Sequence, residues 1–220
     1  MNSPRLVVAD AAGKPRKRRW KSRAWWLRQL HTWHFMSAAL SLAGMLMFAA
    51  TGVLLNHAGS IVAKPVVTER AGRLAPSLLG ALKIAAKPGA PLPAEVAAAV
   101  AAQTGLDPGA NIGEWSASEV YVALPRPGGD AWVSIDRASG RISGEKTDQG
   151  WVSYLNDLHK GRNTGAAWGW FIDLFAAACI VFSVTGLFLL KFLARGRPST
   201  WPLVGIGIAV PLLLIILFIH

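Results

Sequence analysis

The chain has 220 residues, a formal net charge of +11 and a hydrophobic content of 52%. Its apolar residues lie in three long blocks and not at amphipathic spacing, which excludes an ordinary soluble domain and indicates an integral membrane protein. The cations gather beside these blocks, as topology signals do, so the charge argues against a nucleic-acid partner and for contact with a lipid bilayer.

Three apolar segments are predicted to cross the membrane as helices. The first lies within residues 25–57, where Phe35–Leu55 supplies 21 residues without a charged side chain. The second covers 166–193 and the third covers 203–220, each near the roughly 17–25 residues that a bilayer crossing requires. Residues 194–202 join the last two as a short basic loop. The predicted fold class is an α-helical integral membrane protein with three transmembrane helices.

The distribution of charge predicts which segments lie on which side. Nine cations and one acid precede the charge-free run, whereas residues 58–165 carry eleven cations and ten acids. Cytoplasmic flanks collect Lys and Arg, so residues 1–24 and 194–202 are predicted to be inside and residues 58–165 outside. The basic tail of residues 1–24 mixes charge, Pro and Gly without apolar periodicity, and is predicted to be disordered.

The outer section between the first two spans is predicted to be a small α+β module over residues 58–150. Gly59–Gly72 is interpreted as a connector, and Pro76–Ala86 has a short helical pattern. Ala94–Gln103 is predicted to be a helix, because a proline precedes it and a glycine follows it closely. The period then changes to that of strands separated by turn-rich segments, which are Ile112–Ser116, Val120–Leu124, Ala131–Ile135 and Arg141–Glu145.

The five histidines lie at the ends of the predicted spans. They are His31 and His34 at the inner end of the first span and, at the outer boundary, His57, His159 and the terminal His220. A neutral imidazole ligates haem iron with one ring nitrogen while the other donates a hydrogen bond, and helices bring two such rings to one macrocycle. An interfacial helix over residues 151–165 would bring His159 to the membrane, which makes His57 and His159 the predicted outer pair.

The inner histidines cannot form such a pair by themselves. His31 and His34 are one helical turn apart, so they share a face and cannot be the opposite axial ligands of one haem. An inner haem would need a ligand from a second copy of the chain or from another subunit. The alternative for each histidine is a solvated polar residue at the membrane interface.

Two charged residues near the outer boundary are further candidates. Asp173 is the only acid within a predicted span, and its expected partners are Arg162, Lys160 or a histidine. The alternative is a hydrated carboxylate at shallow depth. Arg162 is suited to bidentate contacts with haem propionates. The sequence has no Ser/His/Asp order, phosphate loop, CxxC or HExxH pattern that would indicate a hydrolase or a nucleotide site.

The first two spans share a short sequence pattern. Phe48–Leu55 in the first span matches Phe182–Leu189 in the second, and both contain a Thr-Gly pair. Because the two spans run in opposite directions, this pattern is that of an inverted repeat. Close packing of small residues is the simpler explanation of a Thr-Gly pair in a membrane helix.

These segments together resemble the PepSY-associated transmembrane proteins. Residues 30–57 look like the opening helix of that family, and Asp157–Gly165 followed by Ser183–Gly186 looks like its second signature. The α+β section between them is similar to a PepSY module. Larger members of the family include haem-bearing inner-membrane reductases that pass electrons outward, for example to ferric siderophores, and smaller ones often accompany periplasmic flavin- or metal-linked proteins.

The resemblance implies a bacterial inner-membrane protein with a cytoplasmic N-terminus and residues 58–165 in the periplasm. It also implies haem ligands at His34, His57 and His159, with His31 as a reserve. This chain departs from the larger reductases because it has three predicted spans and one PepSY-like module, so a complete two-haem path within one chain does not follow.

Three functional hypotheses result from this reading. The first is an electron-transfer subunit that binds haem b, with His57 and His159 as axial ligands, Asp173 and Arg162 tuning the site or holding propionates, and a periplasmic redox or metal-handling protein as partner. The second is a membrane-anchored interaction or inhibitory module without redox activity. The third is a metal-uptake accessory that binds iron or copper directly at the outer histidines. A homodimer is a further candidate assembly.

Overall fold

A computed structural model of the chain describes residues 22–61, 64–83, 89–109, 111–194 and 196–219. These residues fold as two compact units. The terminal unit combines the residues up to Met36 with those from Val181 onward, and the central unit is Ser37–Ile180. Most of the tail that was predicted to be disordered, and the candidate ligand His220, lie outside the described residues.

Three helices are long and apolar enough to cross a membrane, judged by length and composition. They are α1 (Arg23–Asn56), α5 (Ala166–Leu193) and α6 (Thr200–Phe218), which confirms the three predicted apolar segments. The helix α1 begins well before the charge-free run, so His31 and His34 lie within the helix and not ahead of it. Many large apolar side chains on all three helices are exposed, as expected of helices that face lipid.

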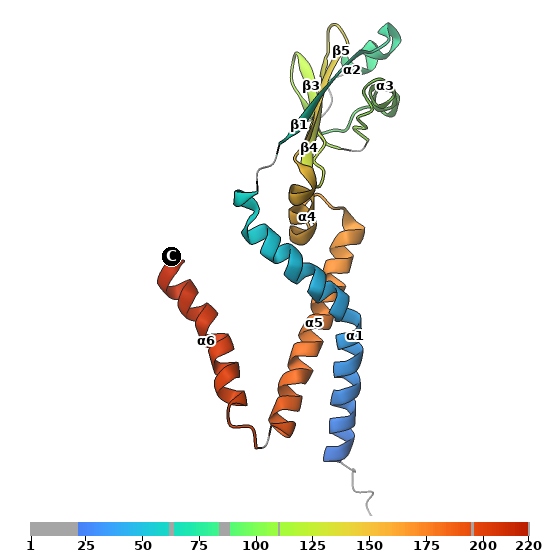
Figure 1. Ribbon diagram of the computed structural model, residues 1–220. Helices are drawn as coiled ribbons and strands as arrows, with labels where there is room; N and C mark the ends of the chain where they lie inside the picture. Colours follow the sequence, from blue (N-terminus) through green and yellow to red (C-terminus); the bar gives the residue numbers. More distant parts are fainter. Residues whose placement is uncertain (1–21, 62–63, 84–88, 110, 195, 220) are drawn as a thin grey trace, which may run out of the picture. The chain divides into compact units, whose positions relative to one another are not determined.

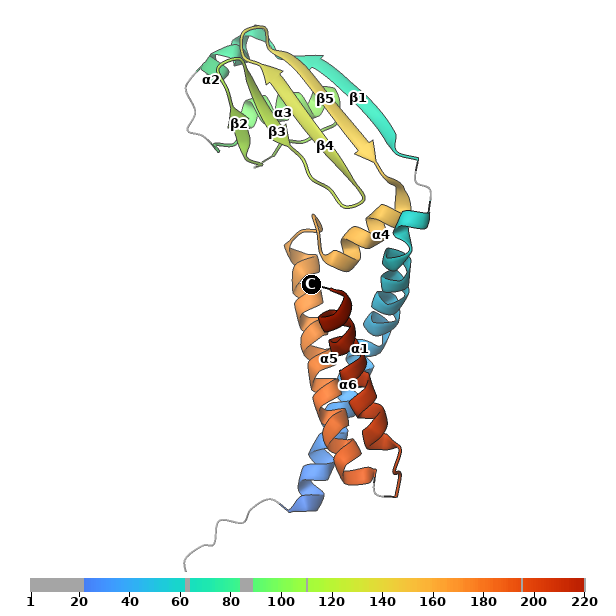
Figure 2. The ribbon, with the colours of Figure 1, turned by 90° about the vertical axis from the view of Figure 1, so that its left-hand side faces the viewer.

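The central unit contains a five-stranded antiparallel sheet in the order β1-β5-β4-β3-β2 (Figure 2). The strands are β1 (Val66–Arg73), β2 (Gly113–Trp115), β3 (Glu119–Ala123), β4 (Gly129–Asp136) and β5 (Arg141–Asp148). The last four fall on predicted strands. The prediction of a connector over Gly59–Gly72 is wrong, because β1 occupies its second half. This edge strand lacks alternating apolar residues and is held by its pairing with β5.

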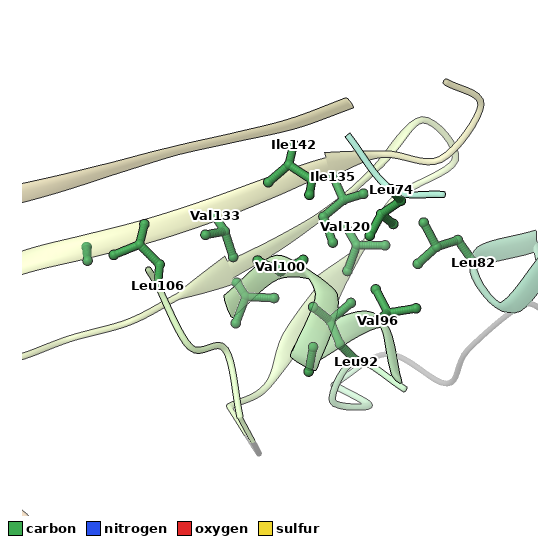
Figure 3. Packing of buried hydrophobic residues seen from close by; sticks show 13 residues of the cluster. Leu74, Leu82, Leu92, Val96, Val100, Leu106, Val120, Val133, Ile135 and Ile142 are labelled. Atoms are coloured by element: carbon green, nitrogen blue, oxygen red, sulfur yellow. The ribbon is translucent and has the colours of Figure 1, made fainter. Parts of the chain in front are cut away.

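One face of the sheet carries the hydrophobic core. The helices α2 (Leu79–Lys83) and α3 (Ala94–Thr104) lie on the same side of the sheet, which Figure 1 shows nearly edge-on. Val96 and Val100 of α3 pack against inward-facing residues of β3, β4 and β5 (Figure 3). The prediction of a helix over Ala94–Gln103 is confirmed, and it ends at Gly105, whose φ of 69° is the left-handed conformation that glycine adopts readily.

Short elements connect the sheet to the long helices. The 3₁₀ helices η1 (Ala58–Ser60) and η2 (Pro76–Leu78) flank β1 along the chain. The helix α4 (Gly150–Lys160) follows β5, as predicted, and ends at Gly161, whose φ is 66°. The indole Nε1 of Trp168 donates a 2.8 Å hydrogen bond to the carbonyl of Leu158, so the corner between α4 and α5 is held by both a glycine cap and a side-chain contact.

Candidate functional site

His159 lies near the end of α4 and contacts α1 within the central unit. Its Nδ1 is 2.7 Å from Oγ1 of Thr51, and its ring centroid is 5.1 Å from that of Phe48. A Cβ added to Gly52 would lie 3.4 Å from Cε1 of His159, so glycine leaves the space that the imidazole uses. The ring of His159 therefore lies against three residues of one F-x-x-T-G segment.

His34 of α1 has an equivalent environment on α5 within the terminal unit. Its Nδ1 is 3.2 Å from Oγ1 of Thr185 and 3.2 Å from the carbonyl oxygen of Phe182. The imidazole of His34 also stacks on the phenyl ring of Phe182, with ring centroids 4.5 Å apart and an interplanar angle of 15°. A Cβ on Gly186 would lie 3.3 Å from Cε1 of His34, so this glycine also makes room for an imidazole.

The sequence match between the two spans thus has a structural counterpart. A histidine ring from another helix lies against each of the matching segments, Phe48–Leu55 and Phe182–Leu189. In both, it lies against the phenylalanine, threonine and glycine at the same positions. The glycine permits the close approach that small residues give in membrane helices. The match was visible in the sequence, but its connection with two particular histidines was not.

The hydrogen bonds of His34 determine where its proton lies. The hydroxyl of Thr185 donates to the carbonyl of Val181 at 2.6 Å, so its oxygen is left to accept from the imidazole. The carbonyl of Phe182 can only accept. Both contacts therefore require that Nδ1 of His34 carries a proton, and in the neutral ring the lone pair is then on Nε2.

His159 has a single contact of this kind. Oγ1 of Thr51 lies 2.7 Å from Nδ1 of His159 and 2.8 Å from the carbonyl of Met47, so the hydroxyl either donates to that carbonyl and accepts from Nδ1–H, or donates to Nδ1 itself. Histidines that ligate a metal donate their other ring N–H to an acceptor such as a carbonyl, which sets the tautomer and orients the ring. His34, whose Nδ1 has a carbonyl partner, thus has the hydrogen bond that a metal-ligating imidazole uses.

The space beside the two rings differs greatly. A cavity of about 750 Å³ adjoins His34 in the terminal unit, within the size range of small-molecule and cofactor sites. Its walls are mainly apolar side chains of α5 and α6, including Leu190 and Val204, and Arg197 adds a positive charge. The cavity beside His159 is only about 30 Å³, which is roughly the volume of one water molecule. The pocket beside His34 therefore has the volume of a cofactor site, whereas the space beside His159 has not.

The other two described histidines have different surroundings. His57 is exposed, and its Nδ1 lies 2.9 Å from the carbonyl of Val53 in its own helix. Among the described residues, the contacts of His57 and His159 are to separate partners, so the axial pair predicted from these two rings stays a prediction. His31 is half-buried on α1, one turn before His34.

Arg162 is paired with an acid that the sequence analysis did not single out. Its Nε donates to Oδ1 of Asp157 at 2.8 Å, and its terminal nitrogen lies 2.6 Å from the same oxygen. Asp157 is only 1% exposed and also accepts from the backbone N–H of Gly128 at 2.9 Å. The expected partner Asp173 is exposed on α5. The only sequence signal for the observed pair was a cation just after the glycine that ends α4.

Direct coordination of a metal ion by protein side chains has little support in the described residues. They contain no group of three or more His, Cys, Asp or Glu side chains placed to hold an ion. A porphyrin supplies four ligands itself and needs only axial imidazoles from the protein. The described residues therefore offer isolated imidazoles and no set of side-chain ligands for an ion.

Comparison with known proteins gave one match. The model of the PepSY_TM-like family matches residues 25–220, which include nearly all of α1 and the whole of the sheet, α5 and α6. No curated protein matched significantly, and no solved structure did so.

Proposed function

The chain belongs to the PepSY_TM-like family, and we propose that it is a membrane electron-transfer subunit that binds haem b in the cavity beside His34. The observation that carries this proposal is a histidine with a defined tautomer at the wall of a cavity of about 750 Å³. When bound, haem b would supply a one-electron iron couple. The protein would hold it, orient its ligand and exclude water.

Each part of the cavity has a role in this proposal. His34 would hold the haem iron through Nε2, and the carbonyl of Phe182 and the hydroxyl of Thr185 would orient its ring through Nδ1–H. Apolar side chains of α5 and α6 would contact the macrocycle. Arg197 would bind a propionate, because a guanidinium matches a carboxylate in charge and geometry.

The cavity supplies one imidazole among its lining residues. A second axial ligand would therefore come from another chain, and a second copy of this protein is the simplest source. The basic flanks indicate that His34 lies toward the cytoplasm of a bacterial inner membrane and that the sheet lies in the periplasm. We propose that electrons pass onward to a periplasmic redox or metal-handling partner.

The test is optical. The full chain, expressed with a haem precursor and purified in detergent, should show a Soret band that shifts on reduction with dithionite, and a pyridine haemochrome assay should give haem of the b type. His34→Ala should lose the pigment. His159→Ala removes the matching histidine at the other F-x-x-T-G segment, where the adjoining cavity is only about 30 Å³, and should keep the pigment.

Colourless wild-type protein after haem-supplemented expression would contradict the proposal and favour a membrane-anchored interaction module without redox activity. A metal count on the same sample separates the remaining hypothesis, because an iron or copper accessory would carry metal without porphyrin. Retention of the pigment in His34→Ala, with its loss in His159→Ala, would return the ligand role to the outer histidine.

A further inference from the structure

The strand β1 is an uncovered edge of the sheet. It pairs with β5 on one side and, among the described residues, with no strand on the other. Its side chains are largely exposed, and Val67 is 54% exposed. An edge strand presents unpaired backbone N–H and C=O groups that can pair with another extended chain.

One point of this edge already binds an amide group. The side chain of Gln103 on α3 accepts from the backbone N–H of Arg73 at 2.8 Å and donates to its carbonyl at 3.0 Å. Alternate residues of a strand turn their backbone groups to opposite edges. The backbone groups of Val67, Glu69 and Ala71 therefore point to the same outer edge, and Gln103 covers only its end.

The sheet face beside this edge is acidic and aromatic. Glu69 lies directly opposite Glu145 in the pairing of β1 with β5, and Glu145 lies opposite Trp132 in the pairing of β5 with β4. Like charges in opposite positions destabilise a sheet. The core helices α2 and α3 lie on the other side of the sheet (Figure 1), so they do not cover this acidic face.

The acidic character extends across the same face to β3. Burial raises the pKa of Tyr121, and the negative charges of Asp130 and Glu114 raise it further. Tyr121 stacks with Trp132 at 5.9 Å between ring centroids. The face thus combines several carboxylates with two aromatic rings.

A groove of about 460 Å³ runs where the edge and this face meet. Its lining residues include Glu69, Ala71, Trp132 and Glu145, with Arg70 as the one cation. Carboxylates beside an indole ring attract Lys and Arg through ion pairs and cation–π contacts. We propose that an extended, cationic segment of a partner protein binds along the outer edge of β1 as a sixth strand, with its basic side chains beside Glu69 and directed toward Glu145.

This inference does not depend on haem. It can be tested with the full chain in detergent and a short fluorescein-labelled peptide that alternates lysine with valine, measured by fluorescence anisotropy. The peptide should bind, whereas two matched peptides should not: one with glutamate in place of lysine, and one methylated at every backbone nitrogen. Equal binding of the methylated peptide would overturn strand addition, and equal binding of the glutamate peptide would overturn the assignment of a cationic partner.

Variants locate the site. Ala71→Pro removes a backbone N–H that points away from β5, so the pairing of β1 with β5 should remain. Peptide binding should weaken about tenfold, because one backbone hydrogen bond to the peptide is lost. Glu69→Gln should weaken binding about threefold, as for an exposed ion pair. Glu95→Gln changes the net charge equally on α3 and should have no effect. Equal affinities of Glu69→Gln and wild type would overturn the placement.

The occupant could instead be a second copy of this chain. In that case the wild-type protein would be a dimer in detergent at low concentration, and Ala71→Pro would be a monomer. That result would overturn the proposal of a cationic partner segment. Equal masses of the wild-type protein and Ala71→Pro in detergent, together with peptide binding by the wild type, would support it.

Discussion

At the scale of single residues, a threonine hydroxyl contacts each of two histidine rings. Thr51 and Thr185 both lie within hydrogen-bond distance of carbonyls of their own helices and of the imidazole of a histidine from another helix. A serine or threonine in a helix can bond the carbonyl four residues back along its own helix. Thr51 also contacts a second helix, because its hydroxyl lies 2.7 Å from Nδ1 of His159 on α4.

The contribution of this contact can be measured with Thr51→Val, which keeps the shape of the side chain and removes the hydroxyl. We expect the free energy of unfolding to fall by about 1 kcal/mol, the usual size of an interhelical hydrogen bond in a membrane protein. Thermal unfolding of the full chain in detergent gives the value. Thr32→Val, at an exposed position of α1, is the control, and equal effects of the two changes would show that the contact with His159 adds nothing.

At the scale of elements, α4 joins the sheet to the apolar helices of the central unit. Near its end, Asp157 accepts hydrogen bonds from Gly128 in the β3–β4 turn and from Arg162. Gly128 has a φ of 74°, and a Cβ there would lie 2.7 Å from Cβ of Tyr154, so the turn lies directly on α4. Two residues after Asp157, His159 contacts α1. One short helix thus links the turn of a sheet to a membrane helix.

Loss of this link should be visible in Asp157→Asn. An amide oxygen can still accept from Gly128, but the ion pair with Arg162 is lost and a buried polar group is left poorly satisfied, so we expect about 2 kcal/mol of destabilisation. Asp148→Asn is the matched control, because Asp148 is exposed and lies 3.6 Å from a partly exposed Arg126, so its loss should change stability by less than about 0.5 kcal/mol. Similar melting temperatures for the two variants would contradict a structural role for the buried acid.

At the scale of the whole molecule, the arrangement of charge predicts a single orientation in the membrane. The sheet lies between α1 and α5 in the chain, and the basic loop lies between α5 and α6. Lys and Arg near the ends of spans are retained in the cytoplasm. The sheet is therefore expected outside the cell membrane and the loop inside.

Cysteine labelling tests this orientation. In a Cys179→Ser background, Ala117→Cys in the exposed β2–β3 turn should react with a membrane-impermeant maleimide in intact spheroplasts. Ser199→Cys in the basic loop should react only after lysis. The reverse pattern would place the sheet in the cytoplasm and remove the basis for a periplasmic partner.

The sequence by itself determined the three apolar helices, four of the strands and the set of candidate histidines. These features follow from local properties, since a span is a run of apolar residues and a half-buried strand is an alternating one. The edge strand β1 was missed for the same reason. Its residues carry no apolar alternation, and only pairing with a distant strand makes them extended.

Only the tertiary structure decided which side chains meet. His34 and Thr185 are 151 residues apart, and no local pattern connects a histidine on one helix with a Thr-Gly pair on another. The same holds for the cavity beside His34, which is lined by side chains of α5 and α6, and for Arg162, which pairs with Asp157 and not with Asp173. Hydropathy and periodicity are properties of a segment, whereas a hydrogen bond or a cavity depends on the packing of several segments in space.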